Sequence, residues 1–227
     1  MEDVRNESPD HVVHVGDLAL SGPRPAEVID RINELGWDGV VGNTDELLWR
    51  PEDLEDRIAR APRLERLLRV LFEVFAPATR EAIGDERLAF LRTLPSELQL
   101  GDDLLLLHAA PGDLWRAPMP DADDAVFEDT YGALDARIVV YGHIHRPFVR
   151  RVGDRVIANS GSVGMCYDDD PRASYLVITD GDVRVKRVAY DVERDVADLF
   201  AVGYPLAGWL TEIRRTGSFV PPPGSDG

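Results

Sequence analysis

The sequence predicts an α/β fold in which a parallel sheet is followed by antiparallel strands. Short β-branched or aliphatic runs alternate with a helical pattern in the first part of the chain, which is typical of a parallel sheet with crossover helices. Several of these runs end in a glycine followed by a polar residue. Beyond residue 147, alternating runs are separated by Gly-Asp or Asp-Gly turns, which are typical of antiparallel hairpins.

The first part of the chain predicts a strand, a helix and a second strand. Between the two β-branched runs, apolar residues recur at helical spacing, with a proline in the first turn and a glycine after the last. Each strand leads directly into a polar turn. The expected elements are the end of a helix in Met1–Pro9, a strand in His11–Val15, a helix in Arg24–Leu35 and a strand in Gly39–Val41.

The middle of the chain predicts a helical insertion and two further strands. From Pro51 to about Leu94, apolar residues recur three or four positions apart, which predicts helices that cover the sheet. The acidic segment Met119–Phe127 predicts a loop. Two apolar runs are too short for helices and are predicted as buried strands: Leu104–Leu107, which ends at His108, and Arg137–Tyr141, which ends at Gly142.

The last part of the chain predicts an antiparallel meander, a helix and a tail. The meander is expected to contain Phe148–Val152, Arg155–Ala158, Ser174–Thr179 and Val183–Tyr190. A helix is expected from Asp195 to about Arg215, and the proline-rich residues 218–227 are expected to be disordered. A chain of 227 residues that is 44% apolar falls within the usual range for one domain, so residues 1–217 are expected to form a single domain.

Composition restricts the classes of function. The chain has 42 acidic and 25 basic residues, a formal net charge of −17, which disfavours nonspecific binding to nucleic acid and to anionic membranes. The single cysteine, Cys166, rules out an internal disulfide framework, and the N-terminus has no signal pattern, so a cytoplasmic setting is expected. The apolar runs are far shorter than the roughly 18 residues of a membrane span. The oligomeric state is left open.

Polar residues of the kinds that bind metals follow four of the expected strands. They are Asp17, Asn43, His108 and the pair His143 and His145. Because the carboxyl ends of strands in an open α/β sheet meet at one edge, these side chains are expected to converge. Carboxylate, amide oxygen and imidazole suit Mn, Fe, Zn or Ni, whereas a thiolate site would need more cysteines.

Each of these residues also has a structural interpretation. Asp17 and Asn43 could be helix caps or turn residues, and His108 alone would be a hydrogen-bonded structural histidine. The order of the whole series favours the metal site. Asp45 is expected to support the site or to cap a helix. Two interpretations of Arg146 stay open, a contact to a substrate phosphate and a surface arginine.

The ordered motifs resemble those of the calcineurin-like metallophosphoesterase superfamily. The matching motifs are Gly16-Asp17, Gly42-Asn43-Thr44-Asp45, His108, Gly142-His143-Ile144-His145 and Asn159-Ser160-Gly161-Ser162-Val163-Gly164. The last of these is similar to a segment of the small bacterial and archaeal phosphodiesterase branch. The resemblance spans roughly residues 8–190. It implies a four-layer α-β-β-α sandwich with a helical insertion.

The resemblance also implies a role for each matched residue. Asp17 would bridge two divalent metal ions. Asn43, His108 and His143 would complete one of them, and His145 would bind the other. Manganese is the first choice for both ions, with Fe, Zn or Ni as alternatives. A hydroxide held between the ions would attack phosphorus in line, so no serine or cysteine nucleophile is needed. Catalysis would depend on Asp17, Asn43 and His143, and Asn43 would also contact the substrate.

Two departures from the family pattern affect this expectation. The first motif of the family, Asp-x-His on the first strand, is absent, and we interpret Met1 as an internal methionine with about 25 residues missing upstream, by analogy with a βαβ unit. Thr44 stands where many relatives have a histidine that protonates the leaving group, a contribution of about 10²–10⁴-fold.

The resulting functional prediction is a metal-dependent phosphodiesterase or phosphatase that acts on nucleotides or small phosphoesters. The alternative is a catalytically silent metal-binding or scaffold relative of the same fold. Loss of the first motif favours the alternative, because Asp17 and His145 alone would hold the second ion weakly.

Overall fold

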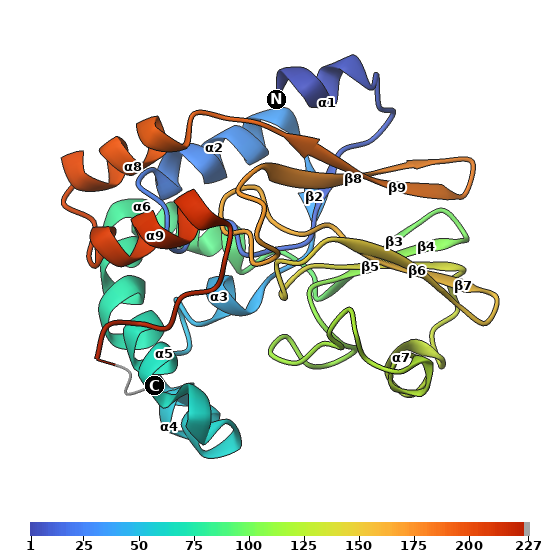
Figure 1. Cartoon of the computed structure of the whole chain (residues 1–227), viewed down its shortest axis with the longest axis horizontal. Helices are drawn as coiled ribbons and strands as arrows, with labels where there is room; N and C mark the ends of the chain where they lie inside the picture. The colour runs from blue at the N-terminus through green and yellow to red at the C-terminus, as the bar shows by residue number, and fades with distance from the viewer. Residues whose placement is uncertain (225–227) are drawn as a thin grey trace.

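The computed structural model describes residues 1–224 and contains a central five-stranded sheet (Figure 1). The strands lie in the order β3-β4-β5-β7-β6. Strands β4, β5 and β7 run parallel, and β3 and β6 are antiparallel to their neighbours at the two edges. The bounds are β3 Glu97–Leu100, β4 Leu104–Leu107, β5 Ile138–Tyr141, β6 Phe148–Val152 and β7 Arg155–Asn159. The central strands are continuous apolar runs because both faces of the sheet are covered.

The two faces of the sheet pack against different elements. Leu105 and Leu107 share a core cluster with Phe127 and Tyr131 of helix α7 (Asp124–Tyr131). The intervening Leu106 packs instead with apolar residues of the hairpin formed by β8 (Ala173–Thr179) and β9 (Asp182–Val188). Successive side chains of a strand point to opposite faces, so the run of leucines in β4 supplies both cores. In Figure 1 the hairpin lies above the sheet and α7 below it.

Helix α1 (Glu2–Asn6) covers the outer face of the hairpin. The Tyr175 hydroxyl donates to the Asp3 carboxylate at 2.6 Å, and the Lys186 ammonium donates to Glu7 at 2.6 Å. The layers therefore follow one another as α7, sheet, hairpin and α1. This arrangement confirms the predicted four-layer α-β-β-α sandwich.

The predicted four-stranded meander is wrong in its pairing. Strands β6 and β7 form an antiparallel hairpin, but β7 also pairs in parallel with β5, and neither strand pairs with β8 or β9. Alternating residues and Gly-Asp turns identify hairpins, but they contain no information about which strand a hairpin joins. Ile157 of β7 lies opposite Val139 of β5, and both side chains are buried in the core between the sheet and α7.

Two short strands, β1 (Val13–His14) and β2 (Asp38–Gly39), pair in parallel beside this stack. Helix α2 (Pro25–Leu35) connects them. It begins with a proline, whose fixed φ suits the first helical position. It ends before Gly36, whose φ of +62° forms a left-handed cap. Both strands are shorter than the predicted runs 11–15 and 39–41.

The segment expected to be a helical insertion is helical between Pro51 and Leu91, apart from a break at Ala61. Its apolar residues form a core with those of α2. Helix α6 is kinked at Gly84, which has φ +71° and ψ 175°. The elements are η1 Pro51–Asp53, α4 Leu54–Arg60, η2 Pro62–Leu64, α5 Glu65–Arg69, the π-helical segment η3 Val70–Phe75 and α6 Ala76–Leu91.

Two predicted boundaries differ from the structure. The acidic segment 119–127 is a loop only as far as Asp123, because α7 begins at Asp124. The single helix expected near the C-terminus is two helices, α8 (Val192–Ala201) and α9 (Ala207–Thr216). Between them Gly203 and Leu206 have φ of +64° and +54°, which a continuous right-handed helix does not permit.

The end of the chain was expected to be disordered over 218–227. Within the described part, residues 218–224 form no helix or strand, but they contact the helices. The Trp209 indole donates to the Val220 carbonyl at 2.9 Å, and Arg66 donates to the Pro223 carbonyl at 2.8 Å. The rest of the prediction falls on residues 225–227, outside the described residues. Across residues 1–224, every helix is too short or too polar to span a bilayer.

The imidazole of His14 makes the folded protein sensitive to acid. Its ring lies against Gly39, where a Cβ would come within 2.3 Å of Nδ1, and its Nε2 is buried without a hydrogen-bond partner in the described structure. Burial lowers the pKa of His14 from 6.5 to about 4. Between pH 6.5 and 4 His14 therefore binds a proton in the unfolded chain but not in the folded chain. The folded state is not penalised by this difference above pH 6.5, and it loses stability as the pH falls from 6.5 toward 4.

We expect His14 alone to lower the free energy of unfolding by up to about 1.4 kcal/mol per pH unit in this window. Urea titrations at several pH values measure it. The His14→Leu variant removes the titrating group, so its free energy of unfolding should depend less on pH between 6.5 and 4 than that of the parent chain. Equal slopes for the two proteins would show that His14 is not responsible.

Candidate metal centre

The predicted site residues lie where strands end. Asp17 follows β1, Asn43 opens the short helix α3 (Asn43–Glu46) after β2, His108 follows β4, and His143 and His145 follow β5. β1 and β2 are parallel, as are β4 and β5, so within each pair the carboxyl ends lie together. The Val15 carbonyl, just before Asp17, lies 2.6 Å from His108 Nδ1 and joins the two pairs.

The structure brings four of these side chains into direct contact. Asn43 Oδ1 lies 2.9 Å from His108 Nε2 and 2.9 Å from His143 Nδ1. His108 Nε2 lies 3.4 Å from Asp17 Oδ2. The two imidazole rings meet edge to face, with centroids 5.3 Å apart. His145 is close enough for its charge to act on the Asp17 carboxylate.

The hydrogen bonds of two rings fix which nitrogen is left for a ligand. His108 Nδ1 faces the Val15 carbonyl at 2.6 Å, and His145 Nδ1 faces the Met165 carbonyl at 2.5 Å. A carbonyl only accepts, so Nδ1 carries the proton in each ring and Nε2 presents a lone pair. A bond from the second ring nitrogen to a backbone carbonyl is the usual support of a metal-binding histidine.

This assignment leaves acceptors facing one another in the cluster. The lone pair of His108 Nε2 points toward Asn43 Oδ1 and lies near Asp17 Oδ2. Acceptors at such distances repel unless a proton or a cation lies between them. The donor set of carboxylate, amide oxygen and imidazole therefore fits a divalent ion of the Mn, Fe, Zn or Ni type.

The side chains are packed against one another and are not spread around an ion position. Among residues 1–224, no three His, Cys, Asp or Glu side chains are arranged as a metal site. Asn43 Oδ1 lies between the rings of His108 and His143. Holding an ion therefore requires these side chains to move apart.

The backbone of the cluster is strained at three of the predicted positions. Asp17, His143 and His145 have φ of +58°, +62° and +58°. Left-handed φ is uncommon for residues other than glycine and costs on the order of 1–3 kcal/mol each. Such strain persists only where the surrounding structure enforces it, and it concentrates at functional sites.

Comparison with known proteins identifies the family. A model of the calcineurin-like phosphoesterase superfamily domain matches residues 1–182, most of the chain. The chain belongs to this superfamily. Members of the calcineurin-like phosphoesterase superfamily bind divalent metal ions, which agrees with the donor set of the cluster.

Individual relatives support the same fold. The chain is 27% identical to an uncharacterized protein of Methanocaldococcus jannaschii, over 93% of this chain and 88% of that protein. The crystal structure of a metallophosphoesterase from Sphaerobacter thermophilus aligns with a TM-score of 0.75 at 24% identity, covering 95% of this chain and 93% of that one. A hypothetical protein from Pyrococcus horikoshii OT3 aligns with a TM-score of 0.75 at 18% identity, over 96% and 90% of the two chains.

Two glycines allow the first two loops of this calcineurin-like fold to touch. A Cβ on Gly16 would lie 2.5 Å from the Gly42 nitrogen, and a Cβ on Gly42 would lie 2.1 Å from Asp17 Oδ1. Asp45 then holds the loops together: its carboxylate accepts the N–H groups of Asp17 at 2.7 Å, Leu18 at 2.8 Å and Gly42 at 3.0 Å. The expected supporting role of Asp45 follows from these bonds.

Burial and neighbouring charges set the pKa values in the cluster. Burial raises the pKa of Asp17, but the imidazoles, with His108 first, outweigh this effect and lower it overall. The pKa of Asp45 is raised to about 6 by burial and by the nearby Asp17 charge. Burial lowers the pKa of His143 to about 4 and also lowers that of His145. A charged Asp17 and neutral imidazoles of His143 and His145 at pH 7 are the states that metal ligands require.

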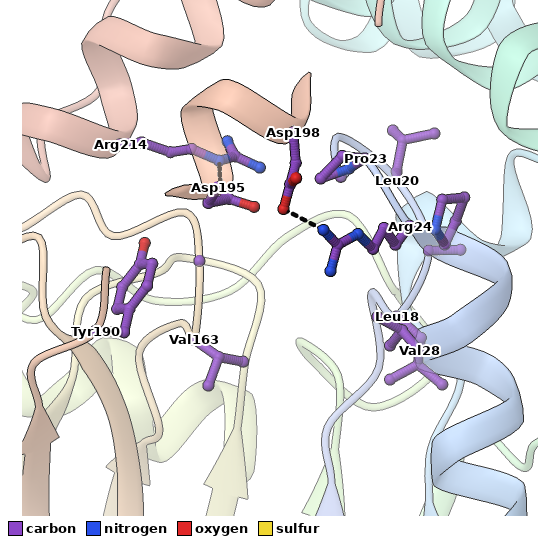
Figure 2. A pocket seen from close by; sticks show the side chains of 14 residues that line it. Leu18, Leu20, Pro23, Arg24, Val28, Val163, Tyr190, Asp195, Asp198 and Arg214 are labelled. Carbon is purple, nitrogen blue, oxygen red and sulfur yellow. Dashed lines mark hydrogen bonds and ion pairs between the residues drawn. The ribbon is translucent and has the colours of Figure 1, made fainter. Parts of the chain in front are cut away.

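A cavity of about 240 Å³ is lined by the segment that follows Asp17 (Figure 2). Leu18, directly after Asp17, and Gly164, directly before Met165, both line it. The walls are largely apolar, and two ion pairs, Arg24 with Asp198 and Arg214 with Asp195, lie along the lining. Within each of these pairs the two charges compensate.

Sequence reasoning missed several groups that support the site. The Val15 and Met165 carbonyls orient His108 and His145, but a carbonyl belongs to every residue and gives no sequence signal. Asn159, recognised only as part of a motif, donates to the Gly142 carbonyl at 2.5 Å and so holds the loop that carries His143.

Arg146 is exposed, and its Nε donates to the Tyr167 carbonyl at 2.8 Å. The two sequence interpretations of this residue both remain, because the bond uses one nitrogen of the guanidinium group. Its contact with a substrate phosphate stays a prediction.

Proposed function

We propose that this chain hydrolyses phosphoester bonds of small molecules or nucleotides, with two divalent metal ions and Mn²⁺ as the first choice. Membership in the calcineurin-like superfamily supports a metal-dependent phosphoesterase in general. The observation that supports this chain's own site is the contact of Asp17, Asn43 and His108 through atoms that all accept hydrogen bonds.

In this proposal each cluster residue has a separate task. Asp17 would supply negative charge to both ions. Asn43, His108 and His143 would hold one ion, and His145 would hold the other. When bound, the ions lower the pKa of a water molecule toward 7 and neutralise charge on the phosphoryl oxygens. Hydrolysis then needs no covalent intermediate with the protein.

The residues around the cluster restrict the substrate. The Thr44 N–H donates to Asp17 Oδ1 at 2.9 Å, and a threonine hydroxyl is too weak an acid to protonate a poor leaving group. We therefore expect phosphodiesters or esters with good leaving groups, bound through Asn43 and Arg146. The cavity beside Leu18 accepts their organic group. The charge of −17 argues against nucleic acid as a substrate, and we place the protein in the cytoplasm.

Hydrolysis of bis-p-nitrophenyl phosphate by chelator-treated protein tests the proposal. We expect no activity without added metal, activity after addition of Mn²⁺, and loss of that activity in His143→Ala. His11→Ala is the matched control, because His11 is exposed and lies outside the cluster. Binding of Mn²⁺ measured by calorimetry, without hydrolysis under any of Mn²⁺, Fe²⁺, Zn²⁺ or Ni²⁺, would support the silent metal-binding relative instead.

A further inference from the structure

His145 is held by a short segment, Met165–Tyr167, that carries no predicted ligand. The Met165 carbonyl faces His145 Nδ1 at 2.5 Å, and the Tyr167 N–H donates to the His145 carbonyl at 3.1 Å. The Tyr167 ring stacks on the imidazole with centroids 4.7 Å apart and an angle of 16° between the planes. This segment thus contacts His145 at its backbone, at the edge of its ring and on the face of its ring.

The segment is itself fixed from several directions. Arg146 Nε donates to the Tyr167 carbonyl at 2.8 Å, and Phe219 meets the Tyr167 ring at an angle of 84° with centroids 5.4 Å apart. The buried Arg214 places Nη1 3.0 Å from the Met165 sulfur and donates to the Ser21 carbonyl at 2.6 Å. The Tyr167 ring therefore lies between the imidazole and the C-terminal segment.

Stacking of Tyr167 on His145 restrains a residue whose backbone conformation is unfavourable. His145 has φ of +58°, a conformation that an isolated loop would leave. A carbonyl bond to Nδ1 restricts one edge of the ring, but it still allows the ring to tilt about that bond. A parallel ring at 4.7 Å blocks that tilt, as expected for aromatic pairs in offset stacking.

We propose that Tyr167 is a positioning residue that holds the His145 imidazole so that Nε2 is the nitrogen available to a divalent ion. This inference rests on the proposed function only in so far as His145 binds an ion. Tyr167 does not contact the substrate and has no chemical role. Phe219, in the segment expected to be disordered, contacts the same ring edge to face.

The test compares Tyr167→Leu, which removes the stacked ring, with Tyr167→Phe, which keeps it. Removal of a group that orients a metal-binding histidine typically costs about 10–100-fold in metal affinity. In Tyr167→Leu we expect the Mn²⁺ dissociation constant to be higher by this factor, as measured by electron paramagnetic resonance of free Mn²⁺. In Tyr167→Phe we expect the dissociation constant of the parent chain. Tyr175→Leu, a tyrosine on β8 that bonds Asp3, is the matched control and should keep the parent affinity.

A second readout uses the metal-free protein at one pH. ¹⁵N-labelled imidazole resonances report the tautomer of His145, which should be protonated at Nδ1 in the parent chain and in Tyr167→Phe. In Tyr167→Leu we expect a shift of these resonances, with mixing of the two tautomers. Circular dichroism shows whether each variant is folded. If Tyr167→Leu does not fold, Phe219→Leu, which removes only the edge contact to Tyr167, replaces it and should give a smaller shift in the same direction.

The two readouts separate this inference from the proposed function. A parent chain that binds no Mn²⁺ overturns the proposed function, and the tautomer measurement then decides the role of Tyr167 by itself. An unchanged His145 tautomer in the folded leucine variant overturns the positioning role, whatever the metal affinity. Loss of affinity in Tyr167→Phe equal to that in Tyr167→Leu also overturns it, because the ring would then not be the cause.

Discussion

The Asp17→Asn variant is expected to lose about a hundredfold or more in kcat/KM for bis-p-nitrophenyl phosphate. The change keeps the shape of the side chain and the oxygen that accepts the Thr44 N–H at 2.9 Å. It removes the negative charge, which the structure places 3.4 Å from His108 Nε2. Charge stabilisation by metal ions supplies several kcal/mol to the transition state, and each 1.36 kcal/mol corresponds to tenfold in rate.

Steady-state kinetics with saturating Mn²⁺, together with thermal unfolding, measure this effect. Asp154→Asn, in the exposed turn between β6 and β7, is the matched control and should behave as the parent chain. The unfolding temperature of Asp17→Asn should change little compared with its rate, because the lost charge faces the imidazoles. A variant with parent kcat/KM would exclude Asp17 from the metal site.

Local patterns predicted the central strands of the fold, whereas its four layers were implied by the family resemblance. The leucine run of β4 and the aliphatic run of β5 could only be strands buried on both faces, and the structure places them at the centre of the sheet. The pairing of β7 with β5 was not predictable in this way. It joins segments through contacts between Val139 and Ile157, which the spacing along the chain does not specify.

The sequence likewise predicted some features of the candidate site and not others. The positions of Asp17, Asn43 and His108 after strands led to the expectation that they meet, and the structure brings them into contact. The left-handed backbone of His143 and His145 could not be read from the sequence, because neither residue is a glycine, the residue type that adopts this conformation most readily. Tyr167, which stacks on His145, lies far from it in the chain and has no spacing that would connect the two.

The Gly42→Ala variant is expected to lower the free energy of unfolding by about 2–4 kcal/mol. A Cβ at this position would come within 2.1 Å of Asp17 Oδ1 and 2.4 Å of the Asp17 nitrogen. The loops must separate to accept it, which weakens the bonds from Asp17 and Gly42 to the Asp45 carboxylate. Loss of hydrogen bonds to a charged, buried acceptor lowers stability more than loss of hydrogen bonds between neutral groups.

Urea unfolding of Gly42→Ala and Gly22→Ala separates this crowding from the general effect of alanine. Nothing lies within 4 Å of a Cβ on Gly22, so that variant should stay within about 0.5 kcal/mol of the parent. The same crowding predicts weaker Mn²⁺ binding in Gly42→Ala than in Gly22→Ala, because Asp17 is the side chain that the new methyl group displaces. Equal stability of the two variants would mean that the first two loops are not held in contact, and the cluster of Asp17 with Asn43 would then lose its structural basis.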